Sequence, residues 1–254
     1  MKEKTGSFQV VELTPGRRIW LNTLDLYWTP HAIYGLLEVD VTPIRRAIAA
    51  HKERSGETLS FTGYLNYCLA HTVDEDKSVQ AFRKGARQLA IFDDVDVAIL
   101  VEGQIGEKKA LMGHIIRGAN HKSYLEIHQE IRRVQSKPVP ASRGMPGWFR
   151  SVMLLPRPLS SLAKSLIALL ARLDPAMLVS MTGTVAITSV GMFGGGHSGW
   201  GLTPTGTPLG LVVGGIAQKP AFVDDRLERP EILSLTGVFD HNVVDGAPAA
   251  RFTR

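Results

Sequence analysis

The chain has 254 residues, of which 44% are hydrophobic and 21% are charged, and this globular composition excludes a disordered or fibrous protein. Its net charge of +5 comes from 29 lysines and arginines, set against 24 acidic residues, that are scattered along the sequence, which disfavours a nucleic-acid-binding face. A modest positive field suits an anionic small ligand such as a phosphorylated cofactor.

The first predicted elements are a strand and the helix that follows it. Apolar and acidic residues alternate toward the end of residues 31–41, which predicts a strand. Residues 42–56 then predict a helix, in which Thr42 is the expected N-cap, Pro43 fits the first helical position and Gly56 marks the end.

The middle of the sequence continues to mix helices and strands. Apolar residues recur at helical spacing over residues 61–76, and strands are expected over 89–103 and 111–119. A helix with a charged outer face is expected over 123–137. The side chains expected to point inward from that last helix are Leu125, Ile127 and Ile131.

Prolines and then apolar residues dominate the next part of the sequence. Residues 137–158 hold five prolines and two glycines, which predicts a loop or linker. Residues 159–181 are strongly apolar and predict a helix that is either mostly buried or packed against a partner. A helix lying on a membrane surface is the alternative, and the thin polar face of this segment disfavours it.

The last third of the sequence is rich in predicted strands. Strands are expected over residues 182–190, 208–223 and 229–241, with a turn over 224–228. Residues 191–201 hold six glycines and predict an irregular segment. Helices and strands are mixed without strict alternation, so the sequence predicts an α+β or mixed-sheet domain.

Signals for disulfides, export and membrane insertion are weak throughout the sequence. Cys68 is the one cysteine, so we expect a buried thiol in a reducing compartment and no disulfide. The sequence has no signal-peptide pattern, and we expect no membrane-spanning helix. These features predict a cytoplasmic protein without a membrane span.

Three common kinds of catalytic or binding motif are missing from the sequence. The stretch "GMFGGG" lacks the Lys-Ser/Thr of a phosphate-binding loop and is not followed by a helical pattern. The eight histidines form no HxH or HExxH pattern, so we expect no metal site. No GxSxG motif indicates a serine hydrolase.

One histidine near the end of the sequence is the main candidate for chemistry. His241 lies in "FDHNVVDGAPAARF", at the end of the last predicted strand, and Asp245 follows four residues later. An imidazole is the side chain best suited to accept a proton from a thiol or hydroxyl at cellular pH. Taken alone, a histidine after a strand is more often structural than catalytic, and Asp245 could cap a helix that has Pro248 near its first turn.

Several stretches of the sequence resemble one family in the same order. "DHNVVDGAPAARF" resembles the His-x-x-x-Asp-Gly signature of the chloramphenicol acetyltransferase-like superfamily, and is most similar to the catalytic domain of the 2-oxo acid dehydrogenase complex acyltransferases. The resemblance covers about residues 14–135 and 180–252. The other stretches that carry it are "PGRRIW", "PHAIYGLLEVDVTPIRR", "FDDVDVAILVEG", "VAITSVGMFGG" and "LTPTGTPLGLVVGGI".

The resemblance implies a role for each matching residue. His241 matches the general base that deprotonates the thiol of coenzyme A or dihydrolipoamide, and Thr188 matches the hydroxyl that stabilises the oxyanion. Asp245 matches a supporting residue, whose implied partner is Arg17 or Arg18. The family places the histidine and the hydroxyl on different subunits of a trimer.

The implied fold is a chloramphenicol acetyltransferase-like mixed β-sheet with flanking helices, in a single catalytic domain over residues 1–254 that forms a homotrimer. Coenzyme A or acyl-CoA is the implied substrate, and the resemblance assigns no residues to contact it. No bound metal is implied. Any lipoyl group is expected to come from another chain.

The sequence also departs from the family pattern. Asn242 replaces the usual arginine after the histidine, and residues 137–180 form an unusually long, Pro-rich and apolar insertion. No lipoyl domain or subunit-binding domain is expected, and the sequence stops at Arg254, before the family's C-terminal anchor. We therefore expect a trimer rather than a larger cage.

Three functions are compatible with these observations. The leading hypothesis is a free-standing, CoA-dependent acyltransferase that passes an acyl group to a thiol such as dihydrolipoamide. The alternatives are a non-catalytic scaffold of an acyltransferase assembly and a small-molecule O-acetyltransferase.

Overall fold

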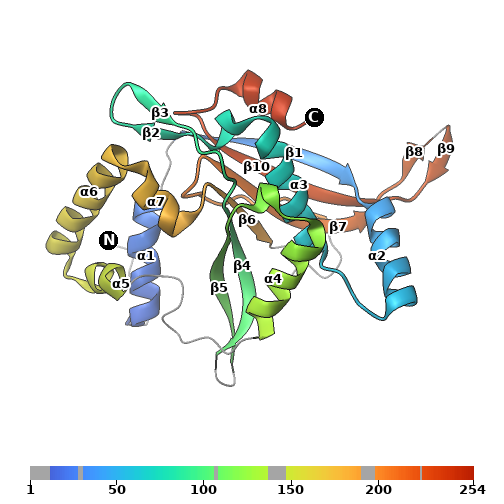
Figure 1. Ribbon diagram of the computed structural model, residues 1–254, viewed down its shortest axis with the longest axis horizontal. Coiled ribbons are helices and arrows are strands. Elements are labelled where there is room, and N and C mark those ends of the chain that lie inside the picture. The colour runs from blue at the N-terminus through green and yellow to red at the C-terminus, as the bar shows by residue number, and fades with distance from the viewer. Residues whose placement is uncertain (1–11, 28–30, 106–107, 137–146, 190–197, 224) are drawn as a thin grey trace, which may run out of the picture.

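A six-stranded mixed β-sheet forms the centre of the computed structural model, which describes residues 12–27, 31–105, 108–136, 147–189, 198–223 and 225–254 (Figure 1). The strand order is β1-β10-β7-β6-β4-β5. The pairs β4–β6 and β6–β7 are parallel and the others are antiparallel. The strands are β1 Ala32–Asp40, β4 Val97–Ile105, β5 Lys108–Ile116, β6 Val185–Ser189, β7 Leu209–Gln218 and β10 Glu231–Asp240.

Short ribbons and helices surround this sheet. Two antiparallel ribbons pair β2 Phe82–Lys84 with β3 Gln88–Ala90, and β8 Ala221–Val223 with β9 Arg226–Glu228. The α-helices are α1 Pro15–Tyr27, α2 Thr42–Ser55, α3 Phe61–Glu75, α4 Tyr124–Ser136, α5 Gly147–Leu154, α6 Arg157–Leu173, α7 Pro175–Thr182 and α8 Gly246–Phe252. Two short 3₁₀ helices are η1 Lys77–Gln80 and η2 Ala119–His121.

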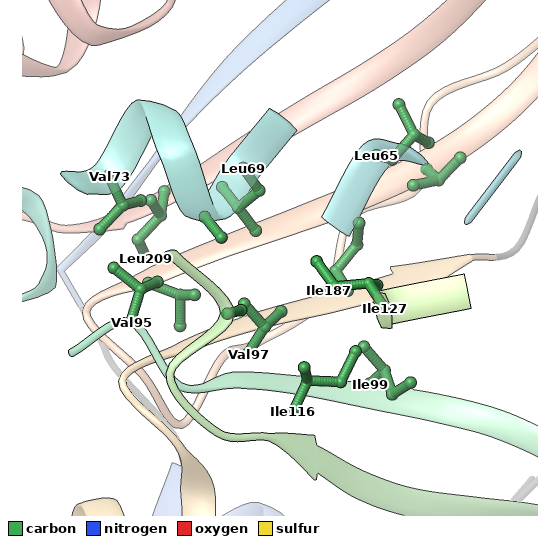
Figure 2. Close-up of a cluster of buried hydrophobic side chains, with 14 of the residues drawn as sticks. Leu65, Leu69, Val73, Val95, Val97, Ile99, Ile116, Ile127, Ile187 and Leu209 are labelled. Carbon is green, nitrogen blue, oxygen red and sulfur yellow. The ribbon is translucent and has the colours of Figure 1, made fainter. Parts of the chain in front are cut away.

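The hydrophobic core lies between the sheet and the helices α3 and α4. Leu69 and Val73 of α3 and Ile127 of α4 point toward apolar side chains of the central strands, among them Val97 and Ile187 (Figure 2). All five side chains are at most 5% exposed. Burial of aliphatic side chains at this density is the main favourable contribution to folding. This packing leaves the ends of the central strands free to carry the loops of a site.

Helices α1, α5, α6 and α7 form a group at one end of the sheet (Figure 1). Helix α1 packs against α5, while α6 packs against both α5 and α7. The connection between α6 and α7 is a sharp break at Asp174, whose carboxylate accepts a hydrogen bond from the Ala176 N–H at 3.1 Å. Pro175 follows directly and cannot donate a backbone hydrogen bond, so one helix cannot run through.

Many sequence predictions agree with these elements. The strand over 31–41 and the helices over 42–56, 61–76 and 123–137 are confirmed within one residue at each end. Gly56 ends α2 with a positive φ of 75°, as predicted for a helix stop. The predicted α+β fold with a mixed sheet is confirmed.

The N-terminal end of α2 differs from the prediction. Thr42 is the first helical residue rather than the N-cap, which is Val41. The Asp40 carboxylate accepts the Thr42 N–H at 2.8 Å. The Thr42 hydroxyl instead accepts the Glu231 N–H at 2.7 Å, and so ties the helix start to β10.

One further predicted strand and the predicted burial of two side chains need correction. The strand over 89–103 is two strands, because β3 ends at Ala90 and β4 begins only at Val97. Leu125 is 46% exposed and does not point inward, because it lies about 200° around the helix from the buried Ile127. Cys68 is only partly buried, and burial raises the pKa of its thiol.

The segment from 137 to 181 departs most from the prediction. Residues 147–154 form helix α5 instead of a loop, while residues 137–146 lie outside the described part of the chain. The predicted single helix over 159–181 is two helices, and the leucines of α6 face outward. The mostly buried alternative is therefore wrong for α6, while packing against a partner stays a prediction. The outward leucines of α6 are Leu159, Leu162, Leu166, Leu169, Leu170 and Leu173, which are between 42% and 71% exposed.

No helix within the described ranges is long and apolar enough to cross a bilayer. The predicted glycine-rich segment over 191–201 lies mostly outside the described residues.

Candidate active site

The turn after β10 carries His241. The Asp240 carboxylate accepts hydrogen bonds from the backbone N–H and the side-chain amide of Asn242, at 2.9 and 2.7 Å. The Asp240 carbonyl accepts two more, from the backbone N–H groups of Val243 and Val244 at 2.9 Å. One aspartate therefore closes the turn and fixes the direction in which the His241 backbone leaves the sheet.

The same turn is tied to the start of β1. The His241 N–H donates to the carbonyl of His31 at 2.9 Å. Asn242 Oδ1 lies 2.9 Å from Nδ1 of the His31 ring. Asn242 thus holds the turn against the neighbouring strand.

His241 and Asp245 lie close together, as the sequence predicts. His241 Nδ1 is 3.6 Å from Asp245 Oδ1, and the two side chains are 43% and 83% exposed. Asp245 occupies the N-cap position of α8, but its carboxylate makes no capping hydrogen bond. The carboxylate is therefore available to orient the imidazole rather than being used by the helix.

Thr188 lies on β6, away from this turn. In the sheet Val185, Leu209 and Phe239 form one row across β6, β7 and β10. Thr188 lies three residues to one side of that row and His241 two residues to the other. Strand geometry therefore separates their Cα atoms by roughly 19 Å within one chain.

The Thr188 side chain faces away from the hydrophobic core. Successive strand residues point to opposite faces, and its neighbour Ile187 is buried in the core. Thr188 is partly exposed, and its hydroxyl has no hydrogen-bond partner among the described residues. Such a hydroxyl is free to donate to a group outside its own chain.

Arg17 and Arg18 lie in the first turns of α1 and are exposed. Arg18 Nη2 donates to the carbonyl of Leu154 in α5 at 3.5 Å. Within the described ranges neither arginine forms an ion pair with Asp245. The structure of one chain thus brings His241 and Asp245 together and leaves Thr188, Arg17 and Arg18 elsewhere.

A cavity that the sequence did not indicate adjoins the His241 turn. Its volume is about 280 Å³, and Asp240, Asn242 and Val243 form part of its wall. Most of the remaining wall comes from α6 and α7. No sequence signal joins these segments, because they meet only in three dimensions. No cluster of three or more His, Cys, Asp or Glu side chains that could hold a metal occurs in the described part of the chain.

Comparison with protein families matches residues 5–139 and 170–254 to the 2-oxoacid dehydrogenases acyltransferase catalytic domain. A stretch of 70 residues is 36% identical to the dihydrolipoyllysine-residue acetyltransferase component of the pyruvate dehydrogenase complex of Zymomonas mobilis. That stretch is 28% of this chain and only 16% of the relative's length, so the chain matches a small part of a longer protein.

Solved structures show the same fold over nearly the whole chain. The dihydrolipoamide acetyltransferase of Azotobacter vinelandii superposes with a TM-score of 0.67 at 21% identity, covering 99% of this chain and 90% of that one. Chloramphenicol acetyltransferase superposes with a TM-score of 0.51 at 12% identity, covering 96% and 95% of the two chains. The resemblance read from the sequence is confirmed: the strand that carries Thr188 and the turn that carries His241 both lie within the matched residues, and the chain belongs to the family of 2-oxoacid dehydrogenase acyltransferase catalytic domains.

Proposed function

We propose that the protein is a CoA-dependent acyltransferase that moves an acyl group between coenzyme A and a thiol such as dihydrolipoamide. The observation that carries the proposal is the His241–Asp245 pair at the end of β10, in a chain of this family. In the related Azotobacter vinelandii enzyme a serine, a histidine and an asparagine have a role in catalysis. The histidine and the asparagine there are four positions apart in sequence, as His241 and Asp245 are here.

The proposed reaction is a direct exchange between two thiols. His241 removes the proton from the attacking thiol, and the resulting thiolate adds to the carbonyl carbon of the acyl thioester. The tetrahedral oxyanion accepts a hydrogen bond from Thr188. When the intermediate collapses, its carbon–sulfur bond to the departing thiol breaks, and the imidazolium returns the proton to that thiolate. Asp245 keeps the imidazole oriented throughout.

The distance between Thr188 and His241 supports a site shared by two copies. A hydrogen-bond donor and a base that act on one tetrahedral carbon must both lie within a few ångströms of it. Within one chain the two residues are roughly 19 Å apart by strand geometry. We therefore assign His241 of one copy and Thr188 of a neighbouring copy to each site, in a homotrimer. An ion pair between Asp245 and Arg17 or Arg18 would likewise need either a rearrangement within the chain or an arginine from a neighbouring copy.

A transfer assay tests the catalytic role of His241. Purified protein is mixed with acetyl-CoA and free dihydrolipoamide, and acetyl transfer is followed for the wild type and for His241→Ala. Loss of a general base lowers the rate by about 10²–10⁴-fold. The matched control is His121→Ala, because His121 is also exposed and pairs with an aspartate, Asp94, away from this turn.

The assay also separates the proposal from the scaffold alternative. Equal activity of wild type and His241→Ala would overturn the role of the histidine. An inactive wild type that assembles into a particle of defined mass would instead favour a non-catalytic scaffold.

A further inference from the structure

The cavity beside His241 is bounded on one side by the helical pair α6–α7 and on the other by the end of the sheet. Its apolar wall includes Phe149 of α5, Ile167 and Ala171 of α6, and Met177 and Met181 of α7. Phe82 and Arg83 of β2 line a further side. The turn between β2 and β3 is held to α6 by a hydrogen bond of 2.7 Å from the Gly85 N–H to the Arg172 carbonyl.

The distribution of side chains on α6 keeps this cavity open. The helix turns Ala168 and Ala171 toward the cavity, while Leu166 and Leu169 face solvent and are each 54% exposed. An amphipathic helix normally directs its large apolar side chains toward the body of the protein. Here small side chains stand where leucines would fill the space, so the hollow follows from the sequence of α6.

The cavity reaches the residues on both sides of the proposed base. Asp240 and Asn242 flank His241 in sequence and line the cavity, and Val243 adds an apolar surface next to them. Three of the other wall residues, Phe149, Ile167 and Ala168, belong to the segment between 139 and 170 that the family match leaves out. This part of the cavity is therefore a property of this chain rather than of the matched family residues.

The volume and chemistry of the cavity fit an aliphatic group much larger than acetyl. About 280 Å³ holds on the order of nine water-sized or methylene-sized groups. Two methionines in its wall can adapt to the shape of a flexible or branched chain. A mostly apolar wall with a few polar groups at one edge is typical of a small-molecule site.

We propose that this cavity binds the acyl chain of the thioester substrate, and that the preferred acyl group is a straight or branched aliphatic chain of about six to eight carbons. The proposal rests on the acyl transfer proposed above, because it places the chain beside the thioester carbon on which His241 and Thr188 act. The cavity would then select the substrate by its acyl group, whichever thiol accepts it.

Filling the cavity tests this assignment. Transfer rates to dihydrolipoamide are compared for acetyl-, butyryl-, hexanoyl- and octanoyl-CoA in the wild type and in Ala171→Phe. We expect the wild-type kcat/KM for octanoyl-CoA to exceed that for acetyl-CoA by at least about tenfold, since each methylene in an apolar pocket contributes substantially. Ala171→Phe is expected to lower that ratio by about tenfold or more.

Two further variants control for the added ring and for a failure of Ala171→Phe to fold. Ser161→Phe adds the same ring to an exposed position of α6 outside the cavity wall and should keep the wild-type ratio. Met177→Ala enlarges the cavity and should move the preference toward longer chains, so the assignment remains testable if Ala171→Phe fails to fold. A wild-type preference for acetyl-CoA, or equal ratios in all variants, would overturn the proposal.

A binding measurement separates this proposal from the transfer reaction. Calorimetric titration of His241→Ala with octanoyl-CoA and acetyl-CoA reports acyl binding without turnover. Tighter binding of octanoyl-CoA that is lost on adding Ala171→Phe would support the cavity even if no transfer were found. Transfer with no preference in rate or binding would leave the acyltransferase proposal in place and contradict the acyl cavity.

Discussion

Single acidic side chains hold the His241 turn and the contact between α4 and β5 in place through hydrogen bonds. At the turn, Asp240 holds the backbone on both sides of His241 through its carboxylate and its carbonyl. Within the described ranges, His241 forms an ion pair with Asp245 at 3.6 Å. The base is therefore positioned mainly by the backbone that carries it, and its ring stays accessible to a substrate thiol.

Glu130 of α4 is the residue at which a dependence of stability on pH is expected. Its carboxylate accepts hydrogen bonds from His114 Nε2 of β5 at 2.8 Å and from Lys122 Nζ at 2.7 Å, and its side chain is 22% exposed. Burial alone would raise the pKa of Glu130, but these two hydrogen bonds outweigh burial and lower it below its ordinary value. The native state therefore releases this proton more readily than the unfolded state does.

The sign of the effect follows from this lowered pKa. The stabilisation by Glu130 is fully present above the unfolded value of about 4.3 and is lost as the pH falls through the folded pKa. Glu130→Gln should lower the free energy of unfolding by roughly 1–2 kcal/mol at pH 7. Urea unfolding at pH 7 and below pH 4 measures this, and the gap between variant and wild type should narrow at the lower pH. Glu53→Gln, on an exposed face of α2, is the control, and a constant gap would contradict the account.

At the scale of single elements, the link from α7 to β6 depends on a glycine that local sequence does not single out. Gly183 has φ 74°, and a Cβ there would lie 2.6 Å from the Asp96 carbonyl oxygen. The same carbonyl accepts the Thr184 N–H at 2.8 Å, which sets the start of β6 beside β4. Close backbone approach and a positive φ together require glycine here.

Replacing this glycine should therefore cost more than replacing another with the same φ. Gly183→Ala should lower the free energy of unfolding by more than about 3 kcal/mol, because strain and a backbone clash combine. Gly56→Ala at φ 75°, with no atom within 4 Å of the added Cβ, should cost only about 1 kcal/mol. Thermal and urea unfolding of both variants compare them. Similar losses would show that the Asp96 contact does not constrain β6.

The elements also show how far the sequence could predict this protein. Helix α2 could be predicted because Pro43 and Gly56 act locally through their own backbone preferences. The exposure of the α6 leucines could not, because an apolar stripe has the same spacing whether it faces the core or solvent. The site was predictable only in part. His241 and Asp245 are neighbours in sequence, whereas the cavity joins α6 to a turn that lies far from it in the chain.

At the scale of the whole molecule, the strand order decides which copies can share a site. Thr188 and His241 lie on opposite sides of the row through β6, β7 and β10, roughly 19 Å apart, so one chain does not bring them together. In a trimer with a site at each interface, every site combines one residue from each of two copies. Two inactive variants can therefore complement each other only if they assemble together.

Mixed assembly of His241→Ala and Thr188→Ala chains tests this arrangement. Co-expressed at equal levels, the two variants should restore about a quarter of the wild-type sites, because a site is intact when each neighbour supplies its unmodified residue. Each variant assembled alone should be strongly impaired. Recovery is measured by the dihydrolipoamide assay, alongside the mass of the particles. No recovery from particles shown to contain both chains would place the two residues in one chain's site or remove Thr188 from it.

The outward leucines of α6 determine how any association through this helix should depend on temperature. Five of them, Leu159, Leu162, Leu166, Leu169 and Leu173, repeat at alternating spacings of three and four residues and are at least 54% exposed. Contacts made through so apolar a surface draw their strength from the release of water, and this driving force weakens on cooling. Any association through this helix should consequently be cold-labile and be strengthened by sulfate, whereas the ion pairs elsewhere on the surface are weakened by salt.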